Sequence, residues 1–342
     1  MNLDRYARQT RYAPLGEEGQ RRLAGSRALL CGCGALGTVL ANTLVRAGVG
    51  RVRIVDRDFV ELNNLQRQVL FDEEDVAATL PKAVAAATKL RKINSDVEIE
   101  PLVADVVHTN ILGLCDGVDV ILDGTDNFET RFLLNDAAIR LGIPWVYGGC
   151  LGAEGQTMTI LPGETACLRC LMSEAPPPGT TPTCDTAGIV GPIIGVIASI
   201  QSMEAMKILS GHREAVSRGL TVVELWDNRI RQVQLGAVRE AIDCPACVRK
   251  ELPWLSGERG SHSAVLCGRN AVQLSFPGRE RLDLDALAKK LQGVGRVAQN
   301  PFLLRLYVDE YVLTLFPDGR AIVGGTDDLA AARVLYAKYV GN

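Results

Sequence analysis

The stretch Gly32-Cys33-Gly34-Ala35-Leu36-Gly37 decides the fold class, because it joins a short apolar run to the start of a helical pattern. Small residues in such a turn let backbone N–H groups and the first turn of the following helix approach an anion closely. We therefore expect a strand before this stretch, a helix after it, and a phosphate held by the turn that contains Gly32, Gly34, Ala35 and Gly37.

Strand-like and helix-like segments alternate on both sides of this turn, as far as about residue 160. Strands that are separated by helices imply βαβ units and a mainly parallel sheet that is covered on both faces. The pattern predicts strands over Arg27–Cys33, Val52–Asp56, Val97–Val103, Val118–Asp123 and Trp145–Tyr147, and helices over Ala35–Gly48, Pro81–Ile93 and Glu129–Leu141. The predicted fold class is α/β, with a Rossmann-like mixed sheet.

After residue 150 the pattern changes to strands joined by turns, which indicates an antiparallel extension of the same sheet. The predicted strands are Gln156–Leu161, Leu220–Trp226 and Arg231–Leu235. Between them lie a loop over Glu174–Thr183, which contains three consecutive prolines, and a helix over Gly191–Gly211.

A polar stretch near residues 248–260 predicts a boundary between two domains. We expect a first domain over residues 1–249 and a small α+β domain over residues 260–342, whose role the sequence leaves open. The predicted elements of this second domain are helices over Asp283–Leu291 and Asp327–Tyr339, and strands over Leu303–Val308, Tyr311–Phe316 and Ala321–Val323.

Composition and charge limit the classes of partner. The chain of 342 residues has a formal net charge of −3 and no basic cluster, so we expect no nucleic-acid partner. The apolar runs are interrupted before the roughly 18 to 20 residues that a membrane helix needs, so we expect no membrane association. The N-terminus lacks the apolar core of a secretory signal, which favours a reducing, cytoplasmic location for its 10 cysteines.

Asp56 closes the second predicted strand, where a carboxylate can hold the hydroxyls of a ribose. The glycine turn and Asp56 alone fit either an ATP site or the site of an NAD-dependent oxidoreductase. Polar residues that follow favour ATP, because Asn64, Arg67 and Lys82 suit a triphosphate rather than hydride transfer. Attack of a carboxylate on the α-phosphate builds negative charge there and on the departing pyrophosphate, which cations and a carboxylate-held Mg²⁺ stabilise.

From Asp4 to about Arg249 these motifs resemble, in order, those of the ThiF/MoeB/HesA adenylating enzymes, relatives of the catalytic domain of ubiquitin-activating enzymes. The motifs are Arg5-Tyr6-Ala7-Arg8-Gln9, the glycine turn, Val55–Glu61, Asn63–Gln68, Pro81-Lys82-Ala83 and Asp123–Arg131. One departure is Ala35, where close relatives often have glycine.

The resemblance implies a role for each matching residue. Arg8 would reach into the active site of a partner subunit, which would make a homodimer the catalytic unit. Asp56 would bind the ribose of ATP, and Asp126 would coordinate Mg²⁺ with Asn127 beside the nucleotide. The nucleotide would also be held by the segment after the second strand and by the next helix, through Asn63, Asn64, Leu65, Gln66, Arg67, Gln68 and Lys82.

Two Cys-x-x-Cys units, Cys167–Cys170 and Cys244–Cys247, have the spacing that lets two thiolates bind one metal ion. Two such pairs form a closed tetrahedral zinc site that stabilises the fold, and two redox dithiols or unligated cysteines are the alternatives. The family commonly carries zinc here. Cys184 is a separate candidate: some relatives use a cysteine at this place to bond the activated carrier covalently, and in others the matching residue is dispensable.

The resemblance predicts ATP-dependent adenylation of the C-terminal glycine of a small ubiquitin-like sulfur carrier that ends in Gly-Gly, similar to ThiS or MoaD. A sulfur-donor protein would then act on the adenylate. Three alternatives stay open from the sequence: adenylation of a tRNA base or a short peptide, an NAD-dependent oxidoreductase, and a non-catalytic scaffold. The sequence does not distinguish among thiamin, molybdopterin, tRNA thiolation and amino-acid pathways.

Overall fold

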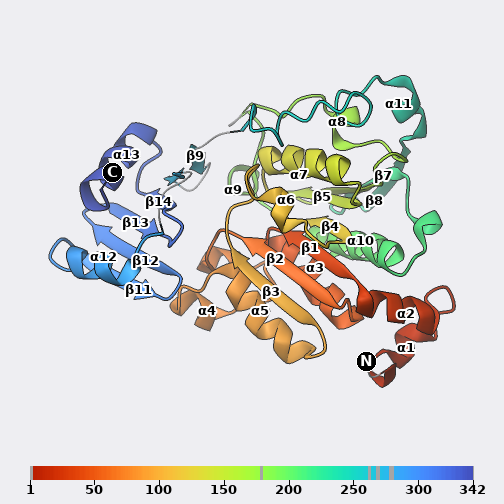
Figure 1. Ribbon diagram of the computed structural model, residues 1–342, viewed down its shortest axis with the longest axis horizontal. Helices are drawn as coiled ribbons and strands as arrows, with labels where there is room; N and C mark the ends of the chain where they lie inside the picture. The colour runs from red at the N-terminus through yellow and green to blue at the C-terminus, as the bar shows by residue number, and fades with distance from the viewer. Residues whose placement is uncertain (1–2, 178–179, 261–262, 267–269, 277–280, 342) are drawn as a thin grey trace. The chain divides into compact units, whose positions relative to one another are not determined.

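The computed structural model describes residues 3–177, 180–260, 263–266, 270–276 and 281–341. The chain divides into two compact units (Figure 1). The first unit runs to Cys184 and continues from Gly188 to Arg259, and the second contains residues 185–187 and everything from Gly260 onward.

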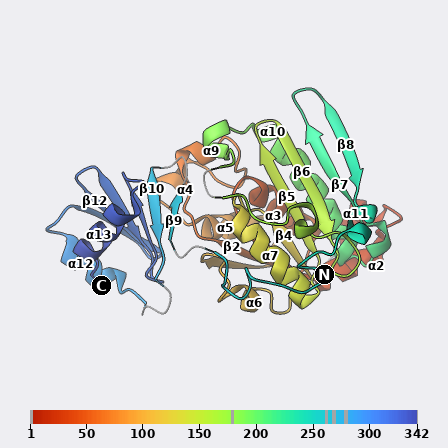
Figure 2. The ribbon, with the colours of Figure 1, turned by 90° about the horizontal axis from the view of Figure 1, so that it is seen from above.

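An eight-stranded sheet forms the centre of the first unit, in the order β3-β2-β1-β4-β5-β6-β7-β8, with β7 and β8 at one edge (Figure 2). The first five strands in this order are parallel, and β6, β7 and β8 are antiparallel. The predicted mixed sheet and its antiparallel extension are therefore confirmed. The strands are β1 (Arg27–Cys31), β2 (Arg51–Asp56), β3 (Glu98–Val103), β4 (Val120–Asp123), β5 (Trp145–Leu151), β6 (Glu154–Ile160), β7 (Gly219–Glu224) and β8 (Arg229–Gln234).

Helices cover both faces of this sheet. One apolar cluster joins residues of α3 (Ala35–Ala47), α5 (Lys82–Ile93) and α10 (Gly191–Leu209) to one face. A second cluster joins α6 (Ile111–Leu114) and α7 (Phe128–Leu141) to the other face. By length and composition α10 could cross a membrane, but here it packs against the sheet and α3.

Short helices complete the first unit, and several of them were not predicted from the sequence. They are η1 (Leu3–Tyr6), α1 (Ala7–Thr10), α2 (Gly16–Gly25), η2 (Leu62–Asn64), α4 (Glu73–Ala77), α8 (Leu168–Leu171), η3 (Arg213–Ala215) and α11 (Gly236–Ala241), and α9 (Cys184–Ala187) begins at the end of this unit. In the predicted loop, residues 174–177 and 180–183 form no helix or strand, and 178–179 lie outside the described residues.

The parallel register places the ends of three strands side by side. Cys31, the last residue of β1, is level with Val55 of β2 and with Asp123, the last residue of β4. The turns that follow β1, β2 and β4 therefore meet at one end of the sheet, which we call its carboxyl end. Binding sites in parallel α/β sheets lie at this end.

The second unit contains a six-stranded antiparallel sheet in the order β11-β12-β13-β14-β10-β9, with two helices packed against it. Three strands in it were not predicted: β9 (Ser263–Leu266), β10 (Ala271–Leu274) and β11 (Arg296–Asn300). They are short, and β10 pairs with a strand almost fifty residues away, which local patterns do not reveal. The predicted elements are β12 (Leu303–Val308), β13 (Tyr311–Leu315), β14 (Ala321–Gly324), α12 (Leu284–Leu291) and α13 (Leu329–Tyr339).

Candidate nucleotide site and metal centre

The glycine turn after β1 packs directly on the turn after β4. A β-carbon on Gly37 would lie 2.1 Å from the Gly32 carbonyl oxygen, and one on Gly124 would lie 2.4 Å from the same atom. Gly32 also has a φ of 87°, which favours glycine. Ala35 is the first residue of α3 and has helical backbone geometry, so its β-carbon is tolerated there. The turn thus presents backbone groups and the start of α3 at the carboxyl end of the sheet.

Asp56 lies beside this turn and is held by two backbone donors. The N–H of Cys33 donates to its Oδ2 at 2.6 Å, and the N–H of Asp58 donates to its Oδ1 at 2.7 Å. Each oxygen has a further lone pair that can accept a hydroxyl, as ribose binding requires. Burial raises the pKa of Asp56, and the nearby Lys82 ammonium opposes that shift.

Lys82 is brought to the same place by the start of α5. Its backbone N–H donates to the Asp58 carbonyl at 2.9 Å, and its Nζ lies 3.3 Å from Asp58 Oδ2. The Lys82 side chain is only 5% exposed, so this ammonium is a buried charge at the rim of the glycine turn. Asp58 was not among the predicted site residues, although it lies within the motif that follows β2.

The segment Asn63–Gln68 brings its last side chain next to the glycine turn. A β-carbon on Gly34 would lie 4.0 Å from Gln68 Nε2, which places the Gln68 amide next to the turn. Gln68 is 3% exposed, and among the described residues its Oε1 has no hydrogen-bond partner. In the same segment Asn64 is buried, Arg67 donates to the Asn63 carbonyl at 2.8 Å, Leu65 packs against the core, and Asn63 and Gln66 are exposed.

The turn after β4 carries Asp126 and Asn127. Asp126 is exposed, and its charge acts on the guanidinium groups of the half-buried Arg57 and the buried Arg131. Asn127 caps α7, because its Oδ1 accepts the N–H of Thr130 at 2.8 Å. An exposed carboxylate beside a phosphate-binding turn has the oxygen donors that Mg²⁺ prefers.

Arg8 lies away from this cluster within its own chain. It is exposed on α1, and its neighbour Gln9 donates to the carbonyl of Ala47 at 3.0 Å. Ala47 is the last residue of α3, whereas the glycine turn precedes the first. A helix of 13 residues is about 20 Å long, so this length separates the two places.

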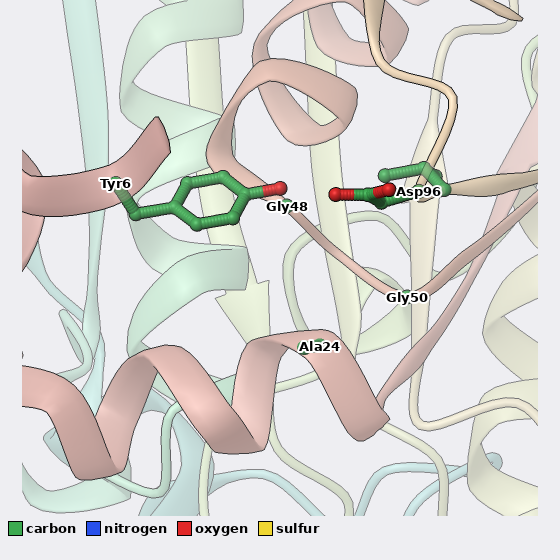
Figure 3. A pocket seen from close by; sticks show the side chains of 6 residues that line it. Tyr6, Ala24, Gly48, Gly50 and Asp96 are labelled. Atoms are coloured by element: carbon green, nitrogen blue, oxygen red, sulfur yellow. The ribbon is translucent and has the colours of Figure 1, made fainter. Parts of the chain in front are cut away.

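A hollow of about 310 Å³ lies near the C-terminal end of α3, whereas the glycine turn precedes its N-terminal end, so the hollow is not the nucleotide site. It is lined by Tyr6, Ala24, Gly48, Gly50 and Asp96, and Figure 3 shows the Tyr6 hydroxyl and the Asp96 carboxylate pointing toward one another. Gly50 immediately precedes β2, so the hollow lies at the opposite end of the sheet from the glycine turn.

Four cysteines meet at a second place in the first unit. The Sγ atoms of Cys167, Cys170, Cys244 and Cys247 all lie within 4.8 Å of one another. Three pairs are separated by 3.8, 3.7 and 3.5 Å. A tetrahedron with Zn–S bonds of about 2.3 Å has sulfur–sulfur edges of about 3.8 Å. The cluster therefore fits one zinc ion with four thiolate ligands.

Helix α7 supports the two segments that carry these cysteines. Asn135 Oδ1 accepts the N–H of Leu168 at 2.9 Å, and Asp136 Oδ2 accepts the N–H of Trp254 at 3.1 Å. The ring of Trp254 also packs on Phe132, with centroids 5.4 Å apart. The same helix thus begins beside the nucleotide site, and its middle contacts the Cys167–Cys170 segment and the chain that follows Cys247.

Because the Asp136 carboxyl is buried, we expect the stability of the protein to depend on pH. Burial raises the pKa of this carboxyl to about 6, above the ordinary value of 3.8. The folded chain therefore holds the carboxyl proton of Asp136 more tightly than the unfolded chain, and stability is lost as the pH rises from the ordinary pKa through the raised one, by up to about 3 kcal/mol.

We expect Asp136→Asn to raise the free energy of unfolding at pH 7.5 and to change it little at pH 4. Denaturant titrations of both proteins at the two pH values, with exposed Asp116→Asn as the control, measure this. An equal effect at both pH values would contradict it.

Cys184 lies at the carboxyl end of β5, near the nucleotide site. Its Sγ is 3.6 Å from the carbonyl oxygen of Cys150, and it is partly buried at the start of α9. The structure places this thiol at the same end of the sheet as the glycine turn.

The fold and the site define an α/β nucleotide-binding protein with a four-cysteine centre, and the comparisons give its family. The pattern of the ThiF family matches residues 6–246, and the chain belongs to that family. A relative that matches over nearly the whole chain is named as an adenylyltransferase, so this chain is an adenylyltransferase of a family that uses ATP.

Named relatives agree with this family. The chain is 46% identical over 339 residues to the sulfur carrier protein ThiS adenylyltransferase of Bacillus subtilis, covering 98% of this chain and 99% of the relative. It is 42% identical over 245 residues to the SAMP-activating enzyme E1 of Haloferax volcanii, covering 72% of this chain and 88% of the relative. A crystal structure of E. coli MccB with succinimide matches with a TM-score of 0.61 at 22% identity, covering 72% of this chain and 74% of that one. At this identity the likeness supports the fold and no further property of the chain.

Proposed function

We propose that this adenylyltransferase uses ATP to activate the C-terminal glycine carboxylate of a small ubiquitin-like sulfur carrier of the ThiS type. The observation that carries the chemistry is the gathering of Asp56, Lys82 and Asp126 around the glycine turn. The Bacillus subtilis relative supports the choice of carrier, because its match extends beyond the first unit and over nearly the whole chain. A thiocarboxylate at the carrier terminus would follow when a sulfur nucleophile attacks the acyl carbon of the adenylate, the bond from this carbon to the AMP oxygen breaks, and AMP leaves.

The reaction needs positioning and charge stabilisation rather than a general base. A carboxylate oxygen of the carrier attacks the α-phosphorus, the bond to the β-phosphate oxygen breaks, and pyrophosphate leaves. The carboxylate is already ionised at neutral pH, so no proton has to be removed. The start of α3 and the Lys82 ammonium offset the negative charge that develops on the phosphates. Arg67 and Gln68 lie on the segment that reaches the same turn.

Mg²⁺ would be held by Asp126 and the phosphates of ATP. When bound, the ion would neutralise part of the charge on the transferred and departing phosphates. The exposed carboxylate of Asp126 next to the turn after β4 supports this role. Asn127, which follows it, would order the start of α7 against the nucleotide.

The four cysteines would bind one zinc ion with a structural role, because four thiolates leave no open coordination position. Zinc would join the Cys167–Cys170 segment, which follows β6, to the Cys244–Cys247 segment near the end of the first unit. In this position the ion acts on folding and not on the chemistry.

A homodimer would complete the active site. Arg8 is exposed and a helix length away from the glycine turn of its own chain, which supports a role in the site of a second copy. A cytoplasmic location, a separate sulfur-donor protein and a covalent role for Cys184 belong to the same proposal.

Exchange of labelled pyrophosphate into ATP tests the proposed function. We expect exchange with Mg²⁺ to depend on a ThiS-like carrier that ends in Gly-Gly, and to disappear when the terminal glycine is removed from that carrier. Carriers of the MoaD type and a short peptide serve as comparison substrates. ATP binding without exchange in the presence of any carrier would refute the proposal and favour a small-molecule or RNA substrate.

A further inference from the structure

We propose that Arg131, which was not among the predicted site residues, is a positioning residue for adenylation. It fixes the turn that carries Asp126 relative to the middle of β5, and it acts through protein groups. This inference rests on the proposed function, since its effect on rate is an effect on adenylation.

Arg131 lies on α7 and joins the end of β4 to the middle of the neighbouring strand β5. Its Nε lies 3.3 Å from Asp123 Oδ2 at the end of β4. Its Nη2 donates to the Thr125 carbonyl at 2.8 Å and to the Gly148 carbonyl of β5 at 3.1 Å. The residue is 8% exposed, so these contacts are made away from water, where loss of one partner is costly.

Asp123 binds the same turn with its other oxygen. Its Oδ1 accepts the Thr125 N–H at 2.9 Å and the Thr125 hydroxyl at 2.7 Å. Thr125 is therefore held through its amide, its hydroxyl and its carbonyl by one buried ion pair. The next residue is Asp126, so the position of the Asp126 carboxylate depends on this pair.

The middle of β5 is packed against the same guanidinium. A β-carbon on Gly149 would lie 3.4 Å from Arg131 Nη2, and the rings of Phe128 and Tyr147 lie 5.5 and 5.4 Å from the guanidinium carbon. Gln201 makes a second link between β4 and β5, because its Nε2 donates to the carbonyls of Asp123 and Val146 at 3.0 and 3.2 Å.

A rigid connection of this kind matters because misplacement by about 1 Å can cost a reaction roughly 100-fold in rate. Loss of Arg131 would remove the hydrogen bonds that join the Asp126 turn to β5, while the glycine turn and Lys82 would keep their contacts. The expected signature is therefore a defect in the use of Mg²⁺, with ATP binding itself largely retained.

The test compares Arg131→Lys, Arg131→Met and Thr125→Val with Arg140→Met, which removes an exposed arginine from the same helix. Thr125→Val keeps the shape of the side chain and loses one hydrogen bond to Asp123, so it is informative even if Arg131→Met fails to fold. Calorimetry measures ATP binding at several Mg²⁺ concentrations, and pyrophosphate exchange measures kcat and KM.

We expect the half-saturating Mg²⁺ concentration to rise about 10-fold and kcat to fall about 100-fold in the Arg131 variants, with a smaller change in Thr125→Val. ATP affinity without Mg²⁺ and all values for Arg140→Met should stay near wild type. Folded Arg131→Lys and Thr125→Val proteins with wild-type Mg²⁺ dependence and kcat would overturn the inference, even if their melting temperatures fell. If wild-type protein shows no exchange with any carrier, the proposed function fails, and the Mg²⁺ dependence of ATP binding still decides the role of Arg131.

Discussion

Asp126→Ala is expected to lower the rate of carrier-dependent pyrophosphate exchange by roughly 100- to 1,000-fold. This is the usual range for removing one group that stabilises developing charge. Asp126 is exposed and follows a turn whose other contacts come from Asp123 and Arg131. The substitution should therefore remove the proposed ligand of Mg²⁺ and leave the fold intact.

The matched control for this variant is Asp116→Ala, which removes an exposed carboxylate from the loop before β4. We expect wild-type exchange from Asp116→Ala, and equal melting temperatures for both variants. Exchange by Asp126→Ala within a few-fold of wild type at low Mg²⁺ would show that Asp126 does not hold the ion.

Cys167→Ser is expected to lower the free energy of unfolding by at least about 3 kcal/mol and to abolish binding of one zinc ion per chain. Cys167 is 1% exposed, and its Sγ lies 3.8 and 3.7 Å from those of Cys170 and Cys244. Binding of zinc to folded thiolates contributes directly to folding, so loss of a ligand should appear as lost stability. Denaturant titration and metal analysis of the purified protein measure both effects.

A chelator provides the internal control for this second experiment. It should destabilise the wild-type protein by a similar amount and have no further effect on Cys167→Ser. The metal assignment would be contradicted if wild type and Cys167→Ser were equally stable. It would also be contradicted if wild-type protein that was purified in the presence of zinc contained none. Since α7 contacts both the nucleotide turn and the cysteine segments, loss of zinc should also reduce ATP binding.

The sequence was sufficient for features that depend on neighbouring residues or on fixed chemical spacing. The glycine turn, the strand that ends at Asp56 and the order of the eight strands of the first unit and its longer helices follow from local patterns, and the structure has them. The meeting of two Cys-x-x-Cys units followed from metal chemistry, because four thiolates at that spacing suit one zinc ion. Parallel strands bring their ends together, so the closeness of the turns after β1, β2 and β4 was also predictable.

Only the tertiary structure decided contacts between residues that are distant in sequence. It placed the Asp58 carboxylate against Lys82, and it anchored the Arg8 segment at the far end of α3, away from its own glycine turn. It also paired Arg131 with Asp123 and Gly148, which an arginine within a helical pattern does not reveal. In each case the partner lies on another element, and the side chain is fixed by burial and hydrogen bonds that form only when the elements pack together.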